Sequence, residues 1–162
     1  MSPIPVKVVR SERRRKTVSA RVVDGTVRIL VPADLPAEEE RQVVESLVAK
    51  VTRKLTAGHI DLEPRARQLA RRHRLPQPVS IEWSDRQTTL WGSCTPTKGR
   101  IRISNRLAGM PDWVLDYVVV HELAHLVEPS HGARFGELVS RYPLSERATG
   151  YLMAMTRSSP MT

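Results

Sequence analysis

Two histidines four residues apart flank a glutamate in the segment His121-Glu122-Leu123-Ala124-His125. On an α-helix, residues four apart share one face, so both imidazoles can bind the same metal ion, with the glutamate one residue round from the first. A hydrolytic zinc site uses three protein ligands and leaves a fourth position for water. His131 lies six residues beyond His125, past a break at Pro129, and can supply the third ligand.

The chemistry that follows from this pattern is hydrolysis. Zinc lowers the pKa of bound water to about 7, and a carboxylate beside it can accept the water proton. We therefore expect one Zn²⁺ ion bound by the three histidines, and a zinc-dependent hydrolase in which Glu122 activates the zinc-bound water. A glutamate on a later helix, Glu137 or Glu146, is the alternative third ligand and leaves the same chemistry in place.

Other residues near the motif are candidates for supporting roles. Asp116 and Glu128 are close enough in sequence to accept hydrogen bonds from the histidine rings and so fix their tautomers. Negative charge that develops during hydrolysis needs a donor, for which Arg134, Tyr117 and Tyr142 are candidates.

The motif falls in a predicted helix that begins near Pro111 and ends before Pro129. Apolar spacing predicts four further helices, over Ala37–Ala57, Leu62–His73, Ala133–Arg141 and Ser145–Met155.

Runs of β-branched residues predict two groups of strands. Because Asp24-Gly25 is a strong hairpin signal, we expect the first group to form an antiparallel element. In the second group, a tight turn at Thr97-Lys98-Gly99 joins the last two strands. The first group covers Val6–Val9, Thr17–Val23 and Thr26–Val31, and the second covers Val79–Trp83, Thr88–Ser93 and Arg100–Ser104.

The length of the chain favours a single domain over residues 1–162. We expect three parts: a basic β-hairpin over 6–31, a helix and strand region over 36–104, and a zinc-binding helical region over 111–156. The sequence has one cysteine, Cys94, no secretory signal at its start, and no apolar run long enough to cross a bilayer. These features predict a cytoplasmic location without a membrane partner.

The net charge of +9 favours acidic partners. Much of the excess lies in the first 30 residues, where eight cations face Glu12 and Asp24. A solvated surface is one interpretation of this cluster, and binding to nucleic acid or nucleotides is the other. The cations are Lys7, Arg10, Arg13, Arg14, Arg15, Lys16, Arg21 and Arg28.

Four segments together resemble the YgjP-like zinc metallopeptidases, and more distantly the SprT and Spartan-like proteases. The segments are Ser11-Glu12-Arg13-Arg14-Arg15-Lys16-Thr17-Val18, Trp91-Gly92-Ser93-Cys94, Asp116-Tyr117-Val118-Val119-Val120 leading into His121 to Leu126, and His131 with Phe135. The resemblance implies a zincin-like α+β fold, zinc ligands at the three histidines, Glu122 as the catalytic residue and a peptide or protein substrate. The spacing also fits metzincins, but these have glycine where this chain has Glu128.

Three alternatives to a peptidase remain open on the sequence alone. Some YgjP-like relatives are described as nucleoside triphosphate pyrophosphatases, and the positive charge suits such a substrate. The basic N-terminal segment also fits a nucleic-acid-associated protease or zinc-binding module. A purely structural zinc site would need a fourth protein ligand, for which only Cys94 offers a thiolate.

The Trp91 to Cys94 segment is either a strand end packed on the core, or a cleft wall or edge strand that pairs with a peptide.

Overall fold

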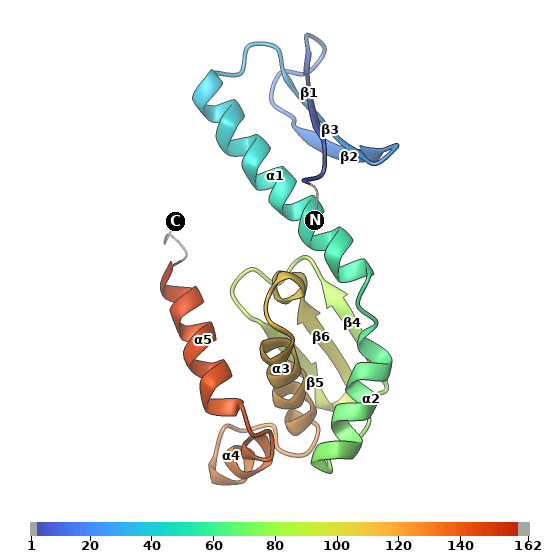
Figure 1. Cartoon of the computed structure of the whole chain (residues 1–162), viewed down its shortest axis with the longest axis vertical. Helices are drawn as coiled ribbons and strands as arrows, with labels where there is room; N and C mark the ends of the chain where they lie inside the picture. The colour runs from blue at the N-terminus through green and yellow to red at the C-terminus, as the bar shows by residue number, and fades with distance from the viewer. Residues whose placement is uncertain (1–2, 159–162) are drawn as a thin grey trace. The chain divides into compact units, whose positions relative to one another are not determined.

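The computed structural model describes residues 3–158 and has the mixed α+β class that the sequence predicts. Five α-helices and two three-stranded sheets lie within these residues. The chain divides between Thr56 and Ala57 into two compact units (Figure 1). The single-domain organisation expected from the sequence stays a prediction.

The first unit is a three-stranded sheet with one helix packed on it. The hairpin at Asp24-Gly25 forms as expected, and both residues have a positive φ, of 50° and 74°, which the tight turn requires. Val27, Ile29 and Val31 are fully buried, and α1 covers them with apolar side chains. The elements are β1 (Val6–Ser11), β2 (Ser19–Val23), β3 (Thr26–Pro32) and α1 (Ala37–Gly58).

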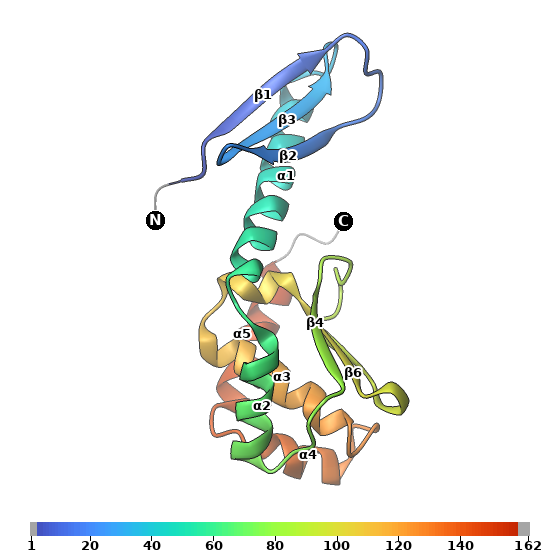
Figure 2. The same ribbon diagram turned by 90° about the vertical axis from the view of Figure 1, so that its right-hand side faces the viewer.

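One part of the strand prediction is wrong, because the N-terminal sheet is not purely antiparallel. The strand order is β1-β3-β2, and β1 runs parallel to β3 (Figure 2). Residues 12–18 carry the chain past the position of β3, which a tight turn could not do. The β-branched composition of a segment predicts that it forms a strand, but not which other strand it pairs with. The parallel pairing of β1 with β3 therefore could not be predicted from composition.

The other face of this sheet carries a row of cations. Arg28 on β3 is the direct cross-strand partner of Lys7 on β1 and of Arg21 on β2. Because side chains alternate between the faces of a strand, these three side chains lie on the face opposite to Val27 and Ile29. All three are exposed.

The second unit packs helices against a second sheet of order β4-β6-β5, in which β5 is an edge strand. β4 is parallel and β5 antiparallel to β6. Short 3-10 turns cover Pro96–Lys98 and Asn105–Gly109. The main elements are α2 (Leu62–His73), β4 (Ser80–Ser84), β5 (Gly92–Thr95), β6 (Arg100–Ser104), α3 (Asp112–His125), α4 (Ala133–Ser140) and α5 (Ser145–Ser158).

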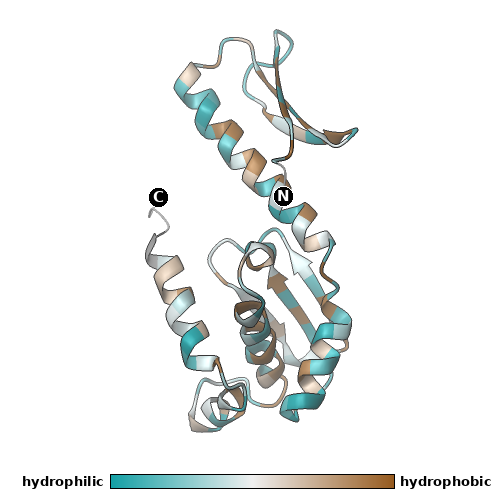
Figure 3. Ribbon diagram, viewed as in Figure 1, coloured by the Kyte–Doolittle hydropathy of each residue, from teal (hydrophilic) through white to brown (hydrophobic). Residues whose placement is uncertain are grey.

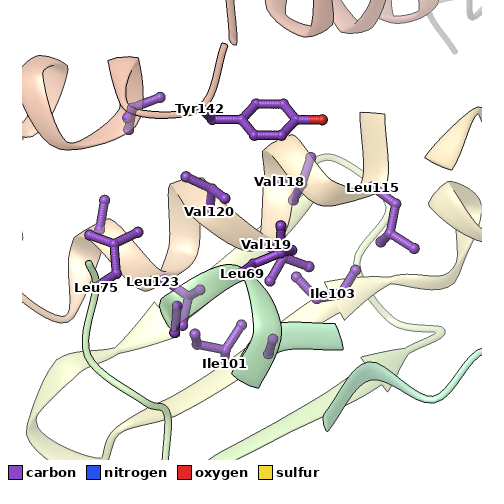
Figure 4. Close-up of a cluster of buried hydrophobic side chains, with 14 of the residues drawn as sticks. Leu69, Leu75, Ile101, Ile103, Leu115, Val118, Val119, Val120, Leu123 and Tyr142 are labelled. Atoms are coloured by element: carbon purple, nitrogen blue, oxygen red, sulfur yellow. The ribbon is translucent and has the colours of Figure 1, made fainter. Parts of the chain in front are cut away.

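Helix α3 runs through the middle of this unit and contacts α2, α4, α5, β5 and β6. It is mostly hydrophobic in sequence (Figure 3), and its valines and leucines meet Ile101 and Ile103 of β6 and Leu69 of α2 (Figure 4). Burial of a whole aliphatic side chain contributes about 1.5–3 kcal/mol, so this cluster holds α3 firmly. Because α3 is held in this way, the residues that it carries outside the cluster also have fixed positions.

The predicted bounds of α2 and β6 agree with the structure, whereas β5 starts four residues later than expected. The segment before β5 is held by other contacts. Ser104 donates its backbone N–H to the Trp91 carbonyl (2.9 Å) and its hydroxyl to the Gln87 carbonyl (3.1 Å), and Arg106 donates to the Leu90 carbonyl (2.8 Å). These bonds replace the strand ladder there.

No helix within residues 3–158 combines the length and the apolar character that crossing a bilayer requires.

Candidate metal centre

Three histidine side chains converge at the C-terminal end of α3. One ring nitrogen from each of His121, His125 and His131 lies within 4.8 Å of the others. The Nε2 atoms of His125 and His131 are 3.0 Å apart. The helix places the first two on one face, and the turn after α3 brings His131 back to them. No carboxylate joins this group among the residues the structure describes, so Glu137 and Glu146 lie outside it.

The orientation of the His125 ring is set by the backbone. Its Nδ1 lies 3.2 Å from the carbonyl oxygen of Glu128, so a protonated Nδ1 donates to that carbonyl and leaves Nε2 free to bind a metal. Glu128 thus has the expected role, but through its main chain and not its carboxylate. The expectation for Asp116 is wrong, because its carboxylate accepts a hydrogen bond from Arg65 Nε (2.6 Å) and ties α2 to α3.

A phenylalanine from α4 contacts all three imidazoles. The Phe135 ring stacks on His125 with the centroids 4.4 Å apart, and it meets His121 and His131 edge-on at 4.9 and 4.8 Å. Phe135 is itself buried in the core of the second unit. It therefore restricts the rotation of each ring and keeps the three nitrogens together.

The two histidines on α3 are held neutral. Burial, followed by repulsion from the His125 and His131 rings, lowers the pKa of His121 to about 4. Burial also lowers the pKa of His125, against the opposing hydrogen bond to Glu128. A neutral imidazole is the form that binds a metal ion, so these rings need not lose a proton first near neutral pH.

Glu122 is a buried carboxylate, with 5% of its surface exposed. Burial raises its pKa to about 7. Its side chain lies against Gly92, the first residue of β5, where an added Cβ atom would stand 2.8 Å from Glu122 Oε1. The glycine therefore makes the space that the carboxylate occupies.

A cavity of about 470 Å³ opens beside Glu122 and His121. Its walls come from residues 89–92, from α3 and from α5. Trp91 and Gly92 belong to the lining, and Gly92 begins the edge strand β5. Trp91 and Cys94 also pack against the core, so both interpretations of the Trp91 to Cys94 segment hold in part.

The comparisons with known proteins bear on this same region. One family model, the YgjP-like metallopeptidase domain, matches residues 54–148, which is more than half of the chain. The chain belongs to the YgjP-like metallopeptidase family. No curated protein and no solved structure matches it. The matched residues include every side chain of the histidine cluster, whereas the basic segment at Ser11 to Val18 lies before them.

For a YgjP-like metallopeptidase, the donor set of the cluster fits a catalytic zinc ion. Three imidazole nitrogens are typical zinc ligands, and a catalytic site keeps one further position for water. Cys94 is not part of the cluster. Burial, and then the charge of Glu122, raises the pKa of the Cys94 thiol to about 11, so the thiol is protonated in the metal-free protein.

The three candidate donors for developing negative charge differ in position. The Tyr142 hydroxyl already donates its hydrogen bond to the Trp113 carbonyl (2.9 Å), so it is not available as a donor to a substrate. Arg134 is exposed on α4. Tyr117 lines the cavity next to His121, and its hydroxyl accepts a hydrogen bond from Thr149 (3.1 Å). Tyr117 is thus the candidate that the structure brings to the cavity.

Phe135 and Gly92 both belong to segments that carry the resemblance, but the sequence does not indicate the role of either position. Nothing in it predicts that the Phe135 ring packs on all three histidines. Gly92 precedes a serine and a cysteine in a strand-like segment, and its contact with Glu122 depends on how β5 packs on α3. A glycine inside a strand is the signal for such a close approach.

Proposed function

We propose that this chain is a zinc-dependent peptidase in which His121, His125 and His131 bind one Zn²⁺ ion and Glu122 is the general base. The observation that carries the proposal is that three imidazole nitrogens lie within 4.8 Å of one another. They meet at the end of α3 that also carries the buried carboxylate of Glu122. Family membership supports a peptide or protein substrate.

When bound, the zinc ion supplies a Lewis acid that polarises a peptide carbonyl and lowers the pKa of water to about 7. Glu122 transfers the protons. One carboxylate oxygen accepts a proton from the water whose oxygen attacks the carbonyl carbon, and that proton then passes to the amide nitrogen as the carbon–nitrogen bond breaks. A general base works best with a pKa near the working pH, and burial moves Glu122 in that direction.

The surroundings of Glu122 favour a peptide over a nucleoside triphosphate. Among the described residues that line the cavity, none is lysine or arginine, and Glu122 is the only acidic one. A triphosphate would meet apolar side chains and a carboxylate where it needs cations. An extended peptide can instead add to the edge strand β5, whose first residue touches Glu122.

The test compares the wild type with Glu122→Gln, a substitution of nearly the same shape. We expect one zinc ion per chain in both proteins, measured by atomic emission, and cleavage of a denatured protein by the wild type alone. Nucleoside triphosphates are assayed in parallel with both proteins. Hydrolysis of a triphosphate without proteolysis would replace the peptidase proposal, and absence of zinc from both proteins would overturn the metal site.

Nucleic-acid binding by the first unit is a second candidate function. The row of Lys7, Arg28 and Arg21 favours it, because like charges placed directly opposite in a sheet destabilise it unless an anion lies over them. A phosphate backbone supplies such anions. Separately, we propose the cytoplasmic location that the sequence predicts.

A further inference from the structure

The cavity beside Glu122 has three walls of different origin. Leu90, Trp91 and Gly92 form one wall. Tyr117 and Val118 form the second wall, on α3, together with His121 and Glu122. The third wall comes from α5. Because His121 and Glu122 belong to the same lining, a group inside the cavity lies directly beside the proposed reaction site.

The wall at Leu90 and Trp91 is fixed in position. The Arg106 guanidinium lies over the Trp91 ring, 4.1 Å from its centroid, and donates to the Leu90 carbonyl at 2.8 Å. Ser104 donates its backbone N–H to the Trp91 carbonyl. These contacts hold the wall in place without a ligand, so the cavity is preformed.

The wall formed by α5 carries two apolar side chains, Leu152 and Met153, beside two threonines, Thr149 and Thr156. Leu152 is buried, whereas Met153 has 53% of its surface exposed, and Leu90 across the cavity has 57%. The hydrogen bond from Thr149 to Tyr117 joins α5 to α3. Large apolar side chains exposed on both sides of an opening that leads to a reaction site indicate an apolar ligand group.

We propose that this cavity receives the bulky apolar side chain of a substrate residue that flanks the cleaved bond, and that Met153 and Leu90 determine this preference. The inference rests on the proposed peptidase function and names its substrate class. A cavity of about 470 Å³ has room for an aromatic or long aliphatic side chain. Apart from His121 and Glu122 at the proposed reaction site, its lining has no ionisable group that could pair with a charged side chain, except for the Tyr117 phenol.

The test uses ten-residue peptides of small residues with one varied central position, occupied by Phe, Leu, Ala or Lys. For the zinc-loaded protein we expect kcat/KM for Phe and Leu to exceed that for Ala by about ten-fold or more. Mass spectrometry should place the cleaved bond next to the varied residue. Values for Phe and Ala within about two-fold of each other would overturn the proposal.

Met153→Asp places a carboxylate at the mouth of the cavity, and Met155→Asp places one on the same helix outside the lining. We expect the first substitution to lower the ratio of Phe to Lys cleavage by about ten-fold or more, and the second to leave this ratio unchanged. Both residues are exposed, at 53% and 37%, so neither substitution should unfold the protein. Equal effects of the two variants would contradict the inference.

A binding measurement separates failure of this inference from failure of the proposed function. Titration calorimetry of the Glu122→Gln protein should show tighter binding of the Phe peptide than of the Ala peptide, and Met153→Asp should remove the difference. If the wild type cleaves no peptide but this binding pattern holds, the peptidase proposal fails and the cavity assignment stands. Cleavage without any preference has the opposite meaning.

Discussion

Glu122 lies against the backbone of Gly92, at a distance that leaves no room for a side chain there. A Cβ atom at position 92 would stand 2.8 Å from Oε1 and 2.9 Å from Cγ of Glu122. The φ of Gly92 is not positive, so its backbone conformation alone does not require glycine. The requirement is for space beside the carboxylate.

The substitution Gly92→Ala is therefore expected to displace Glu122 and to lower kcat by about 100-fold or more, because proton transfer depends on the position of the carboxylate. Zinc content should stay at one ion per chain, since the three atoms nearest to the added Cβ all belong to Glu122 and none to a histidine. Gly136→Ala is the matched control, because an added Cβ meets nothing within 4 Å at that position. Equal activity of the two variants would contradict the steric role of Gly92.

The metal-free protein should show a pH dependence that originates in Glu122. The pKa of this group is about 7 in the folded protein and near 4.5 when unfolded. The folded state therefore holds an extra proton between these values, and the free energy of unfolding falls as the pH rises from 4.5 to 7. The loss is on the order of 3 kcal/mol.

Glu122→Gln removes this dependence, so the metal-free variant should be more stable than the wild type at pH 8 and nearly equal to it at pH 4.5. Urea denaturation in the presence of a chelator measures both differences. All other ionisable groups are the same in the two proteins, so the difference between their stabilities isolates Glu122. A difference between the two proteins that is the same at pH 4.5 and pH 8 would be evidence against a buried, protonated Glu122.

Phe135 should contribute to metal affinity without binding the metal. Phe135→Leu keeps an apolar side chain but loses the flat ring that stacks on His125 and meets His121 and His131 edge-on. We expect the Kd for zinc to rise by roughly ten-fold, since residues that orient metal ligands affect affinity on this scale. Competition with a chromogenic chelator measures the change. Leu138→Val, also buried on α4, is the control for the loss of packing and should change the Kd much less.

The cationic row of the first sheet predicts a dependence on salt. Replacing Lys7, Arg21 and Arg28 with Gln should weaken binding to a 20-nucleotide DNA. The slope of the logarithm of the binding constant against the logarithm of the salt concentration should become smaller in magnitude by about two to three. Arg41, Lys50 and Lys54 of α1 are exposed too, and their replacement removes the same charge from another surface. If both triple variants bind equally, the row has no specific role in binding.

The same row gives a second readout in the absence of any partner. At low salt, Arg28→Gln alone should stabilise the protein by about 0.2–1 kcal/mol, because Arg28 faces a cation on each side. Urea denaturation at 20 and 500 mM NaCl should show this gain and its loss by screening.

The sequence predicted those features that depend on local spacing. The bounds of α2 and β6, the hairpin at Asp24-Gly25, and a helix carrying His121 and His125 all follow from residue periodicity and turn chemistry. The meeting of His131 with the other two rings, which the structure contains, needed only a short turn.

Contacts between distant segments could not be read in this way. The parallel pairing of β1 with β3, and the Arg65 partner of Asp116, join residues that are far apart along the chain. The stacking of Phe135 on the histidines depends on how α4 packs against α3. None of these leaves a periodic signal, because each depends on how whole elements pack.

The three histidines differ in their access to solvent, since His131 is exposed whereas His121 and His125 are partly buried. His131 also lies between α3 and α4, outside both helices. Local opening of such a segment needs far less free energy than unfolding of α3. Release of zinc should therefore begin at His131 and proceed without global unfolding, which would make the metal exchangeable and the active fraction of the protein responsive to the free zinc concentration around it.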